Sequence, residues 1–459
     1  MGARIVWGML LLVLAAVAAG AAETAKSDAE SPLAHLDFRQ VISSAKDKVF
    51  PAVVYIKVLQ ETHESGQKIS QEVSGSGVIL SDKGEVLTNW HVVDKAVDVR
   101  CLLLDGRGLD AKVVGSDKDV DLALLQLALP AGAKTPFAVL GDSDKLKEGD
   151  FVMAMGAPWG LSRSVSMGIV ACARRFLPGA SQYSLWLQTD ASISPGNSGG
   201  PLVNTAGEVI GINARGAVTG GDIGFAVPAS IIRDIVAQIR QYGRVNWSWT
   251  GLQLQPLKDF DRNIYFDATE GVIVAETDPE SPARRAGIQA RDRIVKVGGK
   301  AVTALTDEDL PAVRRMLGLL PKHQKVAFDL VRGDKPLAVE IEPREKGKVE
   351  GAELDCPRWD LTVREINQFD NPDLFFYRAK GVFVYGVKGP GNAELAGLRP
   401  LDIVVKIDGR EVTTLDDVRA IHKEAIENLK TKHRAIFSVL RNGLVRQVVL
   451  DFSRDFSKE

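Results

Sequence analysis

The sequence predicts a mainly β protein, with one large all-β domain followed by two copies of a smaller module. Three observations carry this prediction. Runs with period-two alternation of apolar and polar residues fill the first half, and blocks of sequence recur at a fixed offset in the second half. The third is that 43 glycines and 20 prolines among 459 residues supply the many turns that short strands need.

The composition excludes several classes of protein. It is 45% apolar and 25% charged, which fits a globular chain rather than a disordered one or a polytopic membrane protein. The formal net charge of -2 provides no field that would attract nucleic acid. The three cysteines are odd in number and widely spaced, so they indicate neither a set of disulfides nor a CxxC metal-binding motif. The six histidines show no spacing typical of a pair of metal ligands. We therefore expect no nucleic acid partner, no metal and no cofactor.

The N-terminus has the features of a signal peptide. Arg4 is followed by an apolar run over 5–18 and by small residues up to Ala22. We expect residues 1–22 to be a cleaved signal peptide. An uncleaved membrane anchor is the alternative, because the apolar run approaches the length that spans a bilayer. Residues 23–36 are polar and are expected to form a flexible segment.

The first folded unit is expected at 37–245. Helical spacing of apolar residues predicts helices over 37–49 and 229–241, the second ending near Gly243. Alternating or continuous apolar runs predict strands at 52–58, 76–80, 85–88, 121–127, 207–212 and 223–227. Short strands with little helix indicate an antiparallel β-barrel or sandwich.

The C-terminal part contains an internal repeat. The segment 271–274 recurs 110 positions later at 381–384, and similar pairs recur at the same offset, such as Ala286-Gly287 and Ala396-Gly397. We therefore expect two related modules, at 246–345 and 353–456. A charged, Gly-containing linker at 346–352 joins them.

Three residues of the first unit have the side chains of nucleophilic catalysis. His91 follows a predicted strand, Asp121 directly precedes an apolar strand, and Ser198 lies between glycines. A buried carboxylate can orient an imidazole so that its other nitrogen accepts a proton, and flanking glycines let a serine hydroxyl protrude from a tight turn. The chain order His, Asp, Ser is that of the chymotrypsin-type triad.

Six blocks in register resemble the HtrA/Deg family of serine proteases, in which an exported trypsin-like domain is followed by PDZ domains. They lie at 88–93, 121–125, 140–143, 188–191, 196–202 and 224–228. The resemblance implies a chymotrypsin-like double antiparallel β-barrel with the active site between the barrels. It also implies two α+β PDZ domains and a homotrimer or higher homo-oligomer.

The same resemblance assigns roles to the site residues. Ser198 is the nucleophile, His91 the general base and then acid, and Asp121 the residue that orients the imidazole. The backbone N–H groups of Gly196 and Ser198 form the oxyanion hole, and Asn197 between them shapes the turn.

The substrate pocket is predicted only in part. Ser192 stands where a trypsin-like pocket carries its acid, so cleavage after Arg or Lys is not favoured. Ile193, Ala214 and Arg215 are expected to line the pocket, which favours small or medium aliphatic residues before the cleaved bond. Arg215 departs from the family, and it either points to solvent or narrows the pocket.

The first repeat offers Gly251, Leu252, Gln253 and Leu254, which resemble the PDZ loop that holds a ligand carboxylate while the ligand adds as a strand. In the second repeat Trp359 replaces the small residue that lets a peptide approach. We expect the first module to bind peptides and the second to have a packing or assembly role.

Two loops bear on regulation. The loop over 174–183 matches the family's sensor of PDZ occupancy. The loop over 61–72 is short, so it lacks the long excursion with which some relatives cap a resting oligomer, and cage formation is in doubt.

Two functions from different classes remain open. The first is an ATP-independent serine endopeptidase of the cell envelope that cleaves unfolded or damaged exported proteins. The alternative is a PDZ-based chaperone or scaffold with minor or latent proteolysis. The intact triad favours the enzyme. Unfolded polypeptides and C-terminal peptides are the expected partners. The expected location is the periplasm, with a membrane-anchored form facing the periplasm as the alternative.

Overall fold

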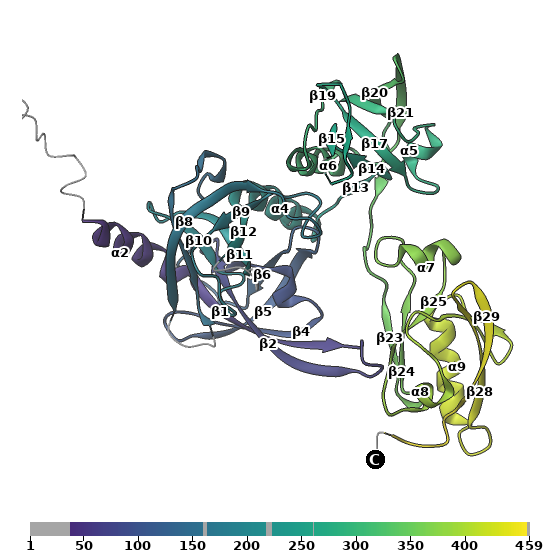
Figure 1. The fold of residues 1–459 in the computed structure, drawn as a ribbon. Helices are drawn as coiled ribbons and strands as arrows, with labels where there is room; N and C mark the ends of the chain where they lie inside the picture. The colour runs from purple at the N-terminus through teal and green to yellow at the C-terminus, as the bar shows by residue number, and fades with distance from the viewer. Residues whose placement is uncertain (1–36, 159–162, 217–222, 260, 457–459) are drawn as a thin grey trace, which may run out of the picture.

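The computed structural model of the chain describes residues 37–158, 163–216, 223–259 and 261–456. The first unit consists of two closed six-stranded antiparallel barrels (Figure 1). Two mixed α and β modules follow in the chain (Figure 1). This architecture confirms the mainly β fold expected from the sequence, including the double barrel that the family resemblance implied.

The first barrel has the strand order β1-β2-β3-β6-β5-β4. Its core is built by alternation, since Val54, Ile56 and Val58 of β1 are all fully buried. The strands are β1 (Val53–Thr62), β2 (Ile69–Ile79), β3 (Glu85–Thr88), β4 (Ala96–Leu102), β5 (Gly108–Asp117) and β6 (Leu122–Leu127).

The second barrel has the strand order β10-β11-β12-β9-β8-β7. Its strands are β7 (Phe151–Gly156), β8 (Ser164–Arg175), β9 (Trp186–Thr189), β10 (Pro201–Asn204), β11 (Val209–Gly216) and β12 (Gly224–Pro228). Each of the six strands predicted from the sequence overlaps an observed strand of one barrel or the other.

Helices flank the barrels where the apolar spacing predicts them. Helix α2 (Phe38–Val49) begins after Asp37, whose side chain accepts a hydrogen bond from the backbone N of Arg39. Helix α4 (Ala229–Tyr242) packs Ile232, Ile235 and other apolar side chains into the core. It ends at Gly243, which adopts a left-handed conformation with φ of 69° that glycine favours.

The first module is built on the strand path β14-β17-β18-β20-β21. Its strands are β13 (Ser248–Trp249), β14 (Leu252–Gln255), β15 (Lys258–Asp259), β16 (Ile264–Tyr265), β17 (Val272–Thr277), β18 (Arg293–Val297), β19 (Lys300–Ala301), β20 (Val326–Arg332), β21 (Lys335–Ile341) and β22 (Arg344–Glu345). Its helices are α5 (Pro282–Arg285) and α6 (Leu310–Gly318).

The second module repeats this path as β24-β25-β26-β28-β29, with one additional strand, β23, beside β24. Its strands are β23 (Glu353–Cys356), β24 (Leu361–Glu365), β25 (Val382–Val387), β26 (Ile403–Ile407), β27 (Arg410–Glu411), β28 (Arg434–Arg441) and β29 (Leu444–Asp451). Its helices are α7 (Pro372–Tyr377), α8 (Asn392–Ala396) and α9 (Leu415–Glu427).

Two sequence expectations are wrong in detail. Half of the loop expected over 61–72 is strand, because β1 runs to Thr62 and pairs there with Ile69 at the start of β2. The first residues of β2 are exposed and mostly polar, so this part of the hairpin has no buried face to produce an apolar alternation. Figure 1 shows the β1–β2 hairpin projecting from its barrel toward the second module.

The second error concerns Trp359. It is fully buried and its ring contacts those of His422, Phe437 and Phe452, so it belongs to the module core. The backbone position of Gly251 in the first module is occupied by Asp360 in the second. Gly251 O accepts a hydrogen bond from Asp278 N, and Asp360 O accepts the matching bond from Lys388 N.

Candidate active site

His91 and Asp121 form a direct pair. His91 lies in helix α3 (Trp90–Val93), immediately after β3, and its Nδ1 lies 2.9 Å from both carboxylate oxygens of Asp121. The backbone N of His91 also donates to Asp121 Oδ1 at 3.1 Å. Asp121 is 2% exposed, whereas the imidazole is 40% exposed. The buried carboxylate therefore holds Nδ1 of an imidazole that is itself partly exposed.

The backbone around Asp121 fixes that carboxylate in place. Asp121 itself has a φ of 56°, a conformation uncommon for a residue with a side chain, in the turn between β5 and β6. The side chain of Asn89 donates to Asp121 O at 3.0 Å, which ties this turn to the segment that precedes His91. The unusual φ is the kind of strain that folds retain at functional positions.

Ser198 lies in a tight turn before β10 that packs against the first barrel. Gly199 has a φ of 84°, and a side chain there would overlap Ser76 O and Thr88 Oγ1. Ser198 O accepts a hydrogen bond from Ser76 N at 2.8 Å, and Ser76 O accepts one from Thr88 Oγ1 at 2.7 Å. Thr88 ends the strand that leads to His91. These contacts hold the Ser198 turn beside the His91 segment, at the junction of the two barrels.

The Ser198 hydroxyl is bonded to a backbone carbonyl in this structure. Ser198 Oγ donates to Ala214 O at 3.3 Å. Among the described residues no hydrogen bond joins Ser198 to His91. In this structure the hydrogen-bonded pair of Asp121 and His91 is therefore not extended to Ser198.

Two backbone donors beside Ser198 are free to bind an oxyanion. In the described part of the chain, neither Gly196 N nor Ser198 N donates to another protein group. Gly196 has a φ of 98°. Asn197 is buried, and Ser164 Oγ donates to its Oδ1 at 3.1 Å. The buried Asn197 side chain anchors the turn between the two free donors.

Ser76 is a site residue that sequence reasoning placed only in a strand. Its hydroxyl donates to Gly196 O at 2.6 Å and accepts from Ala157 N at 2.8 Å. It thereby holds the turn of the predicted oxyanion hole against the loop after β7. No local signal reveals this role, because its partners lie 120 and 81 positions away in the sequence.

The predicted pocket residues lie near Ser198 in part. Ala214 is buried and its carbonyl contacts the Ser198 hydroxyl. The side chain of Ile193 lies against Gly224, where an added Cβ would overlap it. Arg215 belongs to β11, where it pairs with Phe225, and its side chain lies outside the part that the structure describes.

The predicted peptide-binding residues lie on an edge strand of the first module. Leu252, Gln253 and Leu254 belong to β14, which pairs with β17. Gly251 precedes them with a φ of 73°, and a side chain there would overlap Ser281. Within the described residues no strand pairs with the other edge of β14.

The turn that carries Asp121 also contacts the first residues of the first module and the residue that follows the module. Asp117 Oδ2 accepts a hydrogen bond from Trp247 Nε1 at 2.7 Å, and burial raises the pKa of this carboxyl to about 7. Lys346 Nζ lies 2.6 Å from Asp119 Oδ2. Trp247 stacks on Tyr183, the last residue of the predicted sensor loop, at 4.2 Å. The Asp121 turn and the predicted sensor loop thus share one junction with the first module.

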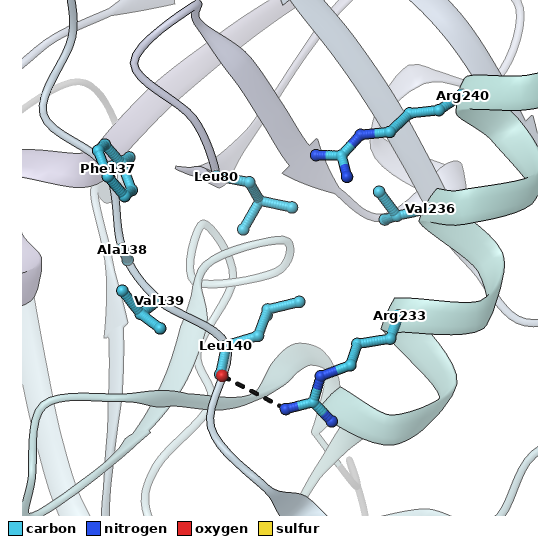
Figure 2. A pocket seen from close by; sticks show the side chains of 8 residues that line it. All are labelled: Leu80, Phe137, Ala138, Val139, Leu140, Arg233, Val236 and Arg240. Atoms are coloured by element: carbon cyan, nitrogen blue, oxygen red, sulfur yellow. Dashed lines mark hydrogen bonds between the residues drawn. The ribbon is translucent and has the colours of Figure 1, made fainter.

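A cavity of about 490 Å³ lies elsewhere, between α4 and the segment 137–140 (Figure 2). Arg233 reaches across it and donates to Leu140 O at 3.3 Å. None of the residues predicted for catalysis lines this cavity.

The described residues also contain no group of three or more potential metal ligands, and no helix among them is long and apolar enough to span a membrane.

Comparisons with known proteins agree with this geometry. Residues 75–212 match the model of a trypsin-like peptidase domain, and residues 273–332 match the model of a PDZ domain. One relative, from Pseudomonas savastanoi pv. phaseolicola, is named "probable periplasmic serine endoprotease DegP-like". The chain is 34% identical to it, over 80% of this chain and 76% of the relative. It is 35% identical to the periplasmic serine endoprotease DegP of Salmonella typhimurium, over 78% of this chain and 73% of the relative.

A solved structure gives the same result. The HtrA-type protease AlgW with decapeptide superposes with a TM-score of 0.56 at 29% identity, covering 66% of this chain and 98% of that one. These matches confirm the family resemblance expected from the sequence. The chain therefore belongs to the DegP/HtrA family of serine endoproteases, with a trypsin-like peptidase domain followed by a PDZ domain.

Proposed function

We propose that Ser198, His91 and Asp121 are the catalytic triad of this endopeptidase. The observation that carries the proposal is the 2.9 Å contact of His91 Nδ1 with the buried Asp121 carboxylate, next to strands that also hold the Ser198 turn. The Asp121 carboxylate accepts a hydrogen bond from Nδ1–H, so the proton stays on Nδ1 and Nε2 is the basic nitrogen.

The reaction follows from these roles. The Ser198 side chain turns from Ala214 O toward His91, and Nε2 takes the hydroxyl proton as Oγ attacks the substrate carbonyl carbon. The protonated imidazole then gives its proton to the leaving amine, and the peptide bond breaks. Water repeats the two steps on the acyl-enzyme and frees Ser198.

The oxyanion hole in this proposal is the pair of N–H groups of Gly196 and Ser198. Both are without a protein acceptor in the described residues, as donors for a developing charge must be. The loss of one such donor typically costs about 3 kcal/mol of transition-state stabilisation. Asn197 is proposed to keep the turn in this conformation through its buried side chain.

We place the primary substrate pocket at Ile193, Ala214 and Arg215. The apolar Ile193 and Ala214 favour a small or medium aliphatic side chain before the cleaved bond. A branched side chain such as valine would bury its methyl groups against Ile193.

The proposed substrates are unfolded or damaged exported proteins in the periplasm. The names of the relatives support this location. The first module is proposed to bind a C-terminal peptide along β14, with Gly251 in the loop that holds the carboxylate. Its free strand edge supports this role. A signal peptide at 1–22 would direct export.

The proposed domain limits are 37–245 for the protease, 246–345 for the first PDZ domain and 353–456 for a second one. The strand path shared by the two modules supports the second assignment. A homotrimer is the proposed basic assembly, by analogy with the family.

The experiment that tests the proposal is digestion of unfolded casein by purified protein and by the Ser198→Ala variant. The wild type is expected to release peptides, and the variant is expected to release none above background. Equal turnover by both proteins would refute Ser198 as the nucleophile. Protection of unfolded protein from aggregation by the Ser198→Ala variant would support a chaperone component that does not need proteolysis.

A further inference from the structure

The second module already holds an extended segment at its edge. Strand β23 pairs antiparallel with β24 through four residue pairs, from Glu353 opposite Arg364 to Cys356 opposite Leu361. Helix α9 packs against both β23 and β24. This is the place and direction in which a PDZ domain adds its peptide, between an edge strand and a helix.

The first module provides the contrast. Strand β14 is the counterpart of β24, and no strand of the described chain pairs with its outer edge. The two modules share their strand path but differ at this edge. A free peptide can therefore add to the first module, whereas in the second it would have to displace β23.

The loop before β24 is also unsuited to a carboxylate. Asp360 stands there in the position of Gly251, and it is buried with a φ of 54°. Its Oδ2 accepts a hydrogen bond from Asn392 N at 2.9 Å, and its own N donates to Pro357 O at 3.2 Å. A ligand carboxylate would meet a negative charge and a donor that is already bonded.

We propose that the second module is a self-occupied docking module. Strand β23 fills the edge that would receive a peptide, and the filled module binds the β1–β2 hairpin of the protease domain instead of a free C-terminus. This inference rests on the proposed assignment of the second module as a PDZ domain.

The hairpin contacts support this partner. Thr362 Oγ1 in β24 donates to His63 O at 2.5 Å, and Tyr385 in β25 donates to Glu64 Oε1 at 2.9 Å. A side chain on Gly66 would overlap the backbone of Lys388, so the hairpin tip lies directly against the end of β25. The β1–β2 hairpin and the second module therefore contact each other through closely packed backbones and specific hydrogen bonds.

Strand β23 takes part in both interactions. Glu353 faces the protease domain, where its carboxylate lies 3.0 Å from His63 Nδ1 and 3.0 Å from Lys95 Nζ. Lys95 follows helix α3, which carries His91. The strand that closes the peptide edge therefore also holds the module to the His91 side of the first barrel.

Hydrogen exchange on the full chain without peptide tests the filled edge. Because β24 is paired on both edges and β14 on one, we expect the amides of Leu361–Glu365 to exchange about tenfold more slowly than those of Leu252–Gln255. Each rate is taken relative to the central strand of its own module, β25 or β17. Equal relative rates would overturn the proposal, because β23 would then not protect the edge.

A matched pair of glycine variants tests the docked hairpin. Gly66→Val and Gly106→Val both place a branched side chain at positive φ in a turn of the first barrel. Gly66 is buried against the second module, whereas Gly106 is exposed and nothing lies within 4 Å of an added Cβ there. We expect Gly66→Val alone to speed exchange of the β25 segment. No change in Gly66→Val, or an equal change in both variants, would overturn the docking.

Neither measurement uses proteolysis as a readout. Failure of the Ser198 proposal therefore leaves these outcomes unaffected, and failure of the docking proposal leaves the triad unaffected.

Discussion

The Ser76 hydroxyl donates a 2.6 Å hydrogen bond to the carbonyl of Gly196, across the junction between the two barrels. The same hydroxyl accepts from Ala157 N, so one side chain joins a strand of the first barrel to two loops of the second. Gly196 provides one of the two proposed oxyanion donors. The orientation of the Gly196 N–H group therefore depends on the Ser76 hydroxyl.

The Ser76→Ala variant tests this dependence. It leaves a buried N–H and a carbonyl without their partner, at a cost of about 1–3 kcal/mol. We expect kcat to fall by roughly 10- to 100-fold with little change in KM, since the oxyanion forms only in the transition state. Ser74→Ala, two residues away in the same strand, is the control. A rise in KM at constant kcat would contradict a role in the oxyanion turn.

Asp121→Asn removes the charge that orients His91 and keeps the size of the side chain. An amide can donate to Nδ1 and so stabilise the wrong tautomer of the imidazole. We expect kcat for casein hydrolysis to fall on the order of 10⁴-fold with an unchanged circular dichroism spectrum. A loss smaller than about tenfold would mean that Asp121 does not orient the base.

His422 makes the stability of the second module sensitive to acid. The imidazole is buried beside Trp359, its Nε2 has no hydrogen-bond partner among the described residues, and burial lowers its pKa from 6.5 to about 4. Between these values the unfolded chain binds a proton that the folded chain does not, so stability falls as the pH drops through this window.

Thermal unfolding of the full chain between pH 7 and pH 4 measures this effect. His422→Phe is expected to lose less stability over the window than the wild type, because phenylalanine binds no proton. His433→Phe changes an exposed histidine of the same module and serves as the control. Parallel loss of stability in His422→Phe and wild type would show that this imidazole does not contribute.

Each module contains one paired arginine and aspartate at the same place in the repeat. Arg441 contacts both oxygens of Asp402 at 2.6 Å, and Arg332 contacts both oxygens of Asp292 at 2.7 Å. The Arg441 side chain is 17% exposed and that of Arg332 is 39% exposed. The pair in the second module is therefore the less solvated.

Because removal of one partner from a buried pair leaves an uncompensated charge, Arg441→Ala should destabilise its module by a few kcal/mol. Arg332→Ala should cost its own module less, since water reaches that pair more easily. Urea unfolding followed by hydrogen exchange in each module separates the two effects. A larger loss of stability in Arg332→Ala than in Arg441→Ala would contradict the expectation that the more buried pair contributes more.

Local patterns predicted much of this molecule. The strand at Glu85–Thr88 and the helices at each end of the protease domain follow from apolar spacing, and they match within a few residues. His91, Asp121 and Ser198 are predicted as site residues because each lies in a short distinctive sequence. The structure places His91 and Asp121 in contact, as the proposed triad requires.

What the sequence could not predict depends on contacts between distant segments. The contact of Ser76 with Gly196 joins residues 120 positions apart. The strand at Glu353–Cys356 has too few residues to show a period, and it forms by pairing with β24. The repeat predicts that Trp359 replaces a small loop residue, whereas its ring is buried in the module core beside Phe437, a contact that local sequence does not show.

The most direct test of the triad is covalent labelling of the intact protein with a fluorophosphonate, followed by mass spectrometry of its peptides. We expect a single adduct on Ser198 in the wild type and none in His91→Ala, because the hydroxyl reacts only when the imidazole takes its proton. Casein hydrolysis by protein whose Ser198 stays unmodified at saturating reagent, or an adduct on another serine that abolishes activity, would contradict the account.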